Sequence, residues 1–182
     1  MTTKNLVQQM QHRAQAVQAV VRRISDRQAA FRYALDLTLA RGGRGMAVAG
    51  FEGGWVEARR PACTAAGIEL LDTAFRDHAE NLHTALTPAD WGIADTGTLV
   101  IDSASEDLRL ATMLAEVHVA LLPVSKIRPD AASLETLLDT ALKSAAPSYL
   151  AFITGASRTA DIERVLAIGV HGPRELHILL ME

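Results

Sequence analysis

The residues best suited to binding or chemistry lie in one stretch near the carboxyl end of the chain. This stretch begins directly after the apolar run 149–153 and combines small, hydroxylated and charged residues. Such a transition is typical of a strand that ends in a turn and leads into a helix. The first turn of a helix favours an anion through its free amides and its dipole, and an arginine adds a bidentate donor. The pattern therefore predicts an anion site made by Gly155, Ser157, Arg158, Thr159 and Asp161.

A purely structural interpretation of the same stretch stays open. Ser157 or Thr159 can cap the helix, and Asp161 can complement the helix dipole. Arg158 can pair with Asp161 or Glu163 in an ordinary surface ion pair. Local chemistry does not decide between the two interpretations.

A second loop, residues 92–98, leads into an apolar run. In open parallel sheets, ligands bind beyond the carboxyl ends of the strands, where the loops gather. The same residues also suit a hairpin turn, because glycine allows positive φ and Asp or Thr forms local hydrogen bonds. Turn chemistry alone favours the hairpin. The predicted anion site nevertheless includes Asp95, Thr96, Gly97 and Thr98.

His171 is the candidate general acid or base of the chain. Imidazole gives and takes protons near neutral pH, and the Gly and Pro residues around His171 indicate a fixed loop. Arg174 follows closely and is included as a further cation of the anion site. The alternative is a histidine whose ring nitrogens are bonded by backbone groups in a rigid turn.

The other histidines and the cysteine form no recognisable metal or cluster site. His118 and His177 lie inside apolar runs, where a hydrogen-bonded structural imidazole is the common case. His78 and His83 are five residues apart, whereas metal ligands on one helical face are three or four apart. Walker, dinucleotide-binding and nucleophile-elbow motifs are missing from the sequence. A single cysteine, Cys63, cannot form an internal disulfide or hold an iron–sulfur cluster, so we expect no metal and no cofactor on this chain.

The apolar pattern predicts an α/β fold. The expected strands are short aliphatic runs at 46–51, 68–71, 98–101, 117–124, 149–153 and 176–181. The expected helices lie between them, at 56–66, 75–86, 108–115 and 132–144. Strands separated by helices indicate a mainly parallel sheet with helices on both faces.

Residues 1–40 are expected to form an N-terminal helical segment, and residues 41–182 the α/β domain. Apolar residues recur at helical spacing over residues 6–24, which predicts a first amphipathic helix. Ser25 and Gln28 resemble a capping box that starts a second helix, and a Gly-Gly pair ends it. The first helix is expected to pack on the body of the protein or on a second copy.

The composition limits the cellular location and the binding partners that we expect. No apolar run reaches about 18 residues and no export signal is evident, so we expect a cytoplasmic protein without a membrane span. Residues 1–44 hold eight of the 18 Lys and Arg residues but two of the 21 Asp and Glu residues. This basic segment lacks a nucleic-acid-binding motif, which favours a solvated helix face over nucleic-acid contact.

Three blocks of the sequence resemble the LUD-domain family, named for lactate utilization, and most closely its lactate utilization protein C branch. The blocks are residues 93–99 (IADTGTL), 154–163 (TGASRTADIE) and 169–180 (GVHGPRELHILL). The similarity extends from about residue 31 to the end of the chain. It implies a fold related to the sugar-phosphate isomerase and CoA-transferase superfamily, in which loops at the strand ends bind phosphates or acyl-CoA.

The resemblance also implies a role in the oxidation of L-lactate to pyruvate, beside two partner proteins of which at least one carries iron–sulfur clusters. The leading hypothesis is therefore a subunit of a lactate utilization system that binds a small anion between the two loops. Two alternatives stay open: a free-standing enzyme acting on a phosphorylated or CoA-linked metabolite, and a non-catalytic regulatory or binding module. Sequence alone does not decide whether the chain is catalytic by itself.

Overall fold

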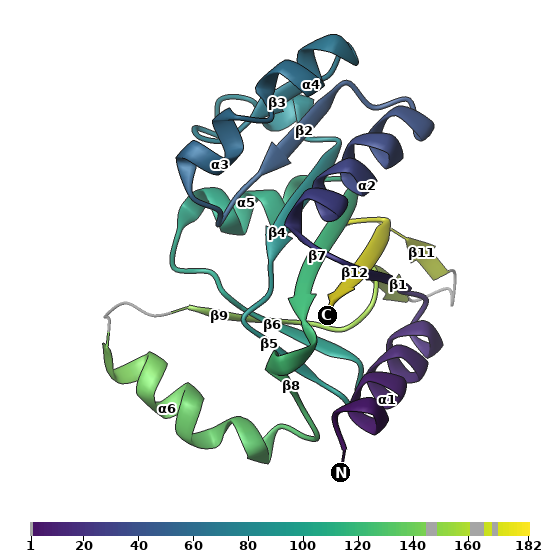
Figure 1. Cartoon of the computed structure of the whole chain (residues 1–182), viewed down its shortest axis with the longest axis vertical. Helices are drawn as coiled ribbons and strands as arrows, with labels where there is room; N and C mark the ends of the chain where they lie inside the picture. Colours follow the sequence, from purple (N-terminus) through teal and green to yellow (C-terminus); the bar gives the residue numbers. More distant parts are fainter. Residues whose placement is uncertain (1, 145–148, 161–165, 169–170) are drawn as a thin grey trace.

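The computed structural model describes residues 2–144, 149–160, 166–168 and 171–182. A six-stranded sheet and a four-stranded sheet form its framework, and helices pack around both (Figure 1). No helix in this described part of the chain is both long enough and apolar enough to cross a membrane.

The six-stranded sheet is parallel throughout, with the strand order β1-β12-β7-β4-β2-β3. Its strands are β1 (Val20–Ile24), β2 (Gly45–Val48), β3 (Glu69–Leu71), β4 (Thr84–Pro88), β7 (Val117–Pro123) and β12 (Glu175–Met181). The paired strands β7 and β12 are the longest, and nearly all of their residues are buried. Near-continuous burial is typical of parallel strands that are covered on both faces. The predicted α/β class with a mainly parallel sheet is confirmed.

Side chains alternate between the two faces of this sheet, because successive residues of a strand point in opposite directions. Leu179 of β12 belongs to one core, and its neighbours Ile178 and Leu180 belong to the other. The first core is covered by α2 (Arg27–Ala40), α3 (Gly53–Glu57) and α4 (Arg60–Ala65). The second core is covered by α1 (Thr3–Ala16), α5 (Glu106–Leu114) and the smaller sheet. The expected covering of both faces is therefore confirmed.

The smaller sheet has the strand order β8-β5-β6-β9. Its strands are β5 (Trp91–Ile93), β6 (Thr98–Asp102), β8 (Ile127–Arg128) and β9 (Leu150–Ile153). Leu99 and Ile101 of β6 face the second core, whereas Val100 packs under Leu134 and the helix α6 (Glu135–Ser144), which lies on the outer side of this sheet (Figure 1). The remaining short elements are η1 (Ala79–Asn81), η2 (Val124–Lys126), η3 (Ala132–Leu134), β10 (Arg158–Ala160) and β11 (Leu166–Ile168).

The predicted first helix is too long. α1 ends at Ala16, Gln18 adopts a φ of 64°, and Val20–Ile24 forms β1, which pairs in parallel with β12. Valine and isoleucine at steps of three or four fit a helical pattern, but their branched side chains also suit a strand. The following helix α2 is present, and its N-cap is Asp26, whose carboxylate accepts a hydrogen bond from the Ala29 amide at 2.7 Å.

The predicted helix over residues 75–86 is also wrong. Its middle is the single turn η1, and its last residues begin β4, a strand inside the larger sheet. The predicted segment 1–40 is therefore not purely helical. The larger sheet contains β1 and β4, which were not expected as strands, whereas the expected strands 98–101 and 149–153 (β6 and β9) belong to the smaller sheet. Because β1 and α2 both contribute to the buried cores, residues 1–40 pack as part of the same unit. The division after residue 40 stays a prediction.

The loop between β5 and β6 fixes how α1 packs. Gly97 in this loop has a φ of +70°, and a Cβ built on it would lie 2.3 Å from the backbone nitrogen of Ala14 in α1. The neighbouring helix residue Met10 is fully buried. Only glycine combines the left-handed backbone with so close an approach of another main chain.

Replacement of Gly97 by alanine should destabilise the protein by about 2 kcal/mol or more, since it combines positive-φ strain with a backbone clash. The measurement is the urea-unfolding free energy of Gly97→Ala and of wild type. Gly53→Ala is the matched control, because a Cβ at Gly53 meets nothing within 4 Å and its φ is not positive. Equal stability of the two variants would contradict this account of α1 docking.

Candidate functional site

A cavity of about 630 Å³ lies between α5, β9 and the start of β12. Its wall includes Val17 after α1, Met113 of α5 and Phe152 of β9, together with the segments 154–158 and 171–173. Two of the three sequence blocks that resemble the LUD-domain family thus meet at one hollow. Its size lies within the range of small-molecule sites.

The cavity lies at the amino ends of the central strands. His118 and Leu176, which also line it, are the second residues of β7 and β12 and are paired in the sheet. Open parallel sheets usually bind ligands at the carboxyl ends of their strands. Here the loop that follows β9 of the smaller sheet brings residues 154–158 to the amino ends of strands β7 and β12 in the larger sheet.

A backbone hydrogen bond joins the two segments at the cavity. The amide of Ser157 donates to the carbonyl of Pro173 at 2.8 Å, which holds residues 171–173 beside the loop after β9. Gly155 has a φ of +73°, and a Cβ there would lie 2.4 Å from the carbonyl oxygen of Val17. The end of α1 and the loop therefore approach one another directly.

The predicted helix at this loop is wrong. Arg158–Ala160 form β10, which pairs antiparallel with β11, and the Ser157 amide is already used by Pro173. An anion held at Ser157 by free amides at a helix start is therefore excluded. Asp161 lies outside the described residues, whereas Thr159 lies in β10.

Arg158 is the cation of the cavity wall. Its guanidinium donates from Nη2 to the carbonyl oxygen of Val17, near the carboxyl end of α1, where a cation complements the helix dipole. A guanidinium has further donors available for a ligand. Among the described lining residues there is no Asp or Glu, so the local charge favours an anion over a cation.

Asp95, Thr96, Gly97 and Thr98 form the turn of a β-hairpin, as turn chemistry favoured. β5 and β6 are antiparallel, and the Gly97 amide donates to the Ile93 carbonyl at 2.9 Å. None of these four residues lines the cavity. The hairpin nevertheless adjoins the loop after β9, because Thr98 Oγ1 lies 2.8 Å from Thr96 Oγ1 and 2.7 Å from Thr154 Oγ1.

His171 is exposed and lines the cavity, whereas Arg174 lies outside it. A neighbouring cavity of about 480 Å³ shares Met113, His171 and Gly172 with the first and extends to Arg174. The Arg174 guanidinium lies 3.9 Å from a carboxylate oxygen of Glu116. His171 thus stands between the two hollows.

His118 also lines the cavity, although the sequence pattern indicated a purely structural imidazole. His118 is 1% exposed, and its Nε2 lies 2.9 Å from the hydroxyl of Thr87 on β4. Its Nδ1 is buried and has no hydrogen-bond partner in the described part of the chain. Burial, with a smaller contribution from His177, lowers the pKa of His118 to about 4, so the ring is neutral at physiological pH. A histidine inside an apolar run was the signal, but the run does not reveal which face it points to.

No cluster of three or more His, Cys, Asp or Glu side chains suited to a metal ion occurs among the described residues. Cys63 of α4 is buried in the first core, and burial raises the pKa of its thiol to about 11. Such a thiol is a poor nucleophile and a poor metal ligand, because both roles need the thiolate.

The model of the LUD domain family matches residues 7–181. The chain belongs to the LUD domain family. The match begins within α1, before the point at which the sequence blocks suggested that the similarity starts.

Curated relatives match part of this LUD domain. It is 36% identical over 112 residues to an uncharacterized protein of Neisseria meningitidis, a match that covers 60% of this chain and 46% of the relative. It is 33% identical over 108 residues to lactate utilization protein C of Halalkalibacterium halodurans, covering 58% of this chain and 47% of the relative. The aligned region therefore spans just under half the length of these relatives.

A solved structure supports the fold of this LUD domain over its whole length. The crystal structure of a DUF162 family protein from Deinococcus radiodurans superposes with a TM-score of 0.67 at 17% sequence identity. The match covers 100% of this chain and 99% of that chain. At this identity the similarity is one of fold.

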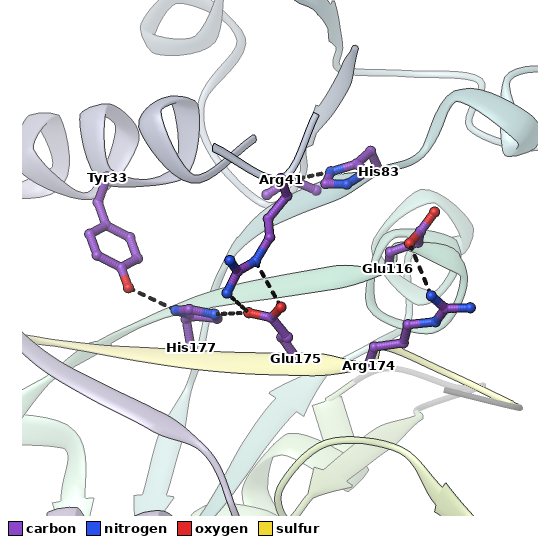
Figure 2. Close-up of polar contacts among 8 residues, drawn as sticks. Tyr33, Arg41, His83, Glu116, Arg174, Glu175 and His177 are labelled. Atoms are coloured by element: carbon purple, nitrogen blue, oxygen red, sulfur yellow. Dashed lines mark hydrogen bonds and ion pairs between the residues drawn. The ribbon is translucent and has the colours of Figure 1, made fainter. Parts of the chain in front are cut away.

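A second polar cluster of the LUD domain lies on the other face of the sheet (Figure 2). The Arg41 guanidinium binds the Glu175 carboxylate in a bidentate manner, at 2.8 and 2.9 Å. Glu175 also lies 2.9 Å from His177 Nε2, and the Tyr33 hydroxyl lies 2.7 Å from His177 Nδ1. An ionised carboxylate only accepts hydrogen bonds, so Nε2 donates to Glu175 and, in the neutral ring, Nδ1 accepts from Tyr33.

This Tyr33–His177–Glu175–Arg41 cluster is a structural tie between α2 and β12. Both nitrogens of His177 are bonded, and burial lowers the pKa of the ring, so it is held neutral. Arg41 is the main cause of the lowered pKa of Glu175. A histidine with both nitrogens occupied has no free group for a ligand, and His177 therefore fits the structural role that its apolar run indicated.

The stability of the LUD domain should fall as the pH is lowered from about 6.5 towards 4. The folded pKa of His118 lies below the unfolded value of 6.5, so the unfolded chain binds the proton first and the stability present above pH 6.5 is lost on acidification. A pKa shift of this size changes the free energy of unfolding by about 3 kcal/mol. Urea-unfolding free energies at several pH values measure the slope.

His118→Phe should reduce this pH dependence, because it removes the buried imidazole. His177 contributes in the same direction, because burial lowers its pKa as well, so part of the slope remains in His118→Phe. An unchanged slope in His118→Phe would contradict the burial of a neutral imidazole at this position.

Proposed function

We propose that this chain is a component of a lactate utilization system and that it binds a small carboxylate in the 630 Å³ cavity. The family and the relatives named lactate utilization protein C support the system. The size and charge of the cavity support a small carboxylate as the ligand. Because the chain spans just under half of these relatives, their complete activity is not carried over to it.

The observation that carries the proposal is the meeting of residues 154–158 and 171–173 around one hollow. Its described wall provides Arg158 and His171 and has no carboxylate of its own. A carboxylate ligand would accept hydrogen bonds from the Arg158 guanidinium and from the hydroxyl of Ser157. His171, exposed at the edge, is placed to exchange a proton with solvent.

Oxidation of L-lactate to pyruvate releases two electrons and two protons. The single cysteine, Cys63, is buried in the core and cannot hold an iron–sulfur cluster by itself. We therefore assign the electrons to iron–sulfur partner proteins and limit this chain to binding, orientation and proton exchange.

Isothermal titration calorimetry with L-lactate and with pyruvate tests the binding step. Arg158→Ala should weaken binding by about tenfold or more, because it removes a charge-assisted hydrogen bond. Arg76→Ala is the matched control, since Arg76 is an exposed arginine that pairs with Glu106 away from the cavity. Because Arg158 also contacts the Val17 carbonyl, unfolding curves must show that the variant is folded.

Ser157→Ala provides a milder test with the main chain intact, and its expected loss of affinity is smaller. Absence of any heat of binding for both carboxylates at millimolar concentration would refute the carboxylate site. Full retention of affinity in Arg158→Ala would refute the role of Arg158. A deletion strain that grows normally on lactate would refute the role in lactate utilization.

A second candidate is an enzyme for a phosphorylated or CoA-linked metabolite, which the neighbouring 480 Å³ cavity favours. The two hollows share Met113, His171 and Gly172, so an extended molecule could occupy both and reach Arg174. Glu116 beside Arg174 opposes a phosphate there. Thermal-shift measurements with acetyl-CoA and sugar phosphates test this candidate, because a ligand that binds the folded state raises the melting temperature. An unchanged melting temperature at millimolar ligand would reject it.

A further inference from the structure

We propose that His118 contacts the ligand through Nδ1, and that the ligand of the cavity carries a hydroxyl or carbonyl oxygen in addition to its anionic group. This inference rests on the proposed carboxylate site and narrows its substrate class. It makes His118 a determinant of specificity, although it lies in a strand of the central sheet and not in a loop.

The first support is an unsatisfied polar atom. His118 is 1% exposed, and its Nδ1 has no hydrogen-bond partner among the described residues. A buried polar atom without a partner costs about 1–3 kcal/mol, and most such atoms in proteins are bonded. The comparison with His177 is direct, because that buried imidazole on the next strand has partners at both nitrogens.

The second support is the position of the ring. Nε2 is held by Thr87 on β4, which lies on one side of β7, and β12 lies on the other side. On β12 the residue paired with His118 is Leu176, and both residues line the cavity. Nδ1, the ring nitrogen that does not bond to Thr87, therefore belongs to a side chain that lines the cavity.

The third support is the kind of group that a neutral imidazole recognises. Burial keeps the ring uncharged, so Nδ1 is a neutral donor or acceptor and does not balance a carboxylate charge. The hydroxyl of Thr87 can donate or accept, which leaves either tautomer available to suit the ligand. A hydroxyl or carbonyl oxygen fits Nδ1, while the carboxylate fits Arg158 in the same wall. A ligand with two such groups would be bound at two points.

Binding of L-lactate and propionate to the intact chain tests this inference, because propionate has the same carbon chain without the hydroxyl. Wild type should bind L-lactate at least about tenfold more tightly than propionate, the equivalent of one buried hydrogen bond. His118→Phe should bring the two affinities together. His118→Asn, whose amide can replace Nδ1, should restore part of the preference.

His177→Phe is the matched control: it alters a buried histidine of the neighbouring strand that does not line the cavity, and it should retain the preference for L-lactate. If His118→Phe does not fold, nitrogen NMR of the wild-type imidazoles provides the readout. The His118 Nδ1 resonance should shift on addition of L-lactate and stay in place with propionate.

The possible failures are distinguishable. Equal binding of L-lactate and propionate by wild type overturns the role of His118 and leaves the carboxylate site standing. A preference that survives in His118→Phe, or a His118 resonance unaffected by L-lactate, also overturns the inference. Binding of neither acid overturns the carboxylate site and this inference together.

Discussion

The parallel pairing of β7 with β12 is the constraint on which the rest of the structure depends. Both strands are buried on both faces, so each residue must suit one of two separate cores. A strand has a period of two, and a shift of one residue would exchange every side chain between these cores. The register that pairs Leu176 with His118 therefore also places His177 opposite Val119 on the other face. The two histidines occupy neighbouring strands but different environments.

The two histidines differ in how their ring nitrogens are bonded. His177 is bonded at both ring nitrogens by residues from α2 and β12, and the chain of contacts ends on Arg41. Such a complete network strengthens the packing of α2 without leaving an unused polar group. The Nε2 of His118 is bonded, whereas its Nδ1 has no partner among the residues that the structure describes. A buried polar atom without a hydrogen-bond partner is costly, and the proposed contact with a ligand gives a reason for the presence of such an atom in the cavity wall.

The end of α1 is as important to the cavity as the strands are. Gly97 packs on Ala14, Gly155 approaches the Val17 carbonyl, and Arg158 donates to that same carbonyl. The first helix thus supports the hairpin and the loop after β9, and Val17 itself contributes to the wall. The positive charge at the cavity comes from a guanidinium held by a helix carboxyl end, and not from the amino end of a helix. Any ligand at this wall therefore depends on how α1 docks.

Local patterns in the sequence were enough to predict the α/β class, six of the twelve strands in the described part of the chain and the hairpin chemistry of residues 95–98. These features depend on short-range periodicity, turn residues and caps, which neighbouring residues determine. Tertiary structure alone decided that Val20–Ile24 is a strand, that Arg158–Ala160 is not a helix, and that His118 lies in the wall of a cavity. β1 depends on its distant partner β12, β10 on its antiparallel pairing with β11, and the position of the His118 ring on Thr87 of β4. Such pairing is specified by the packing of the whole core, and no local pattern contains it.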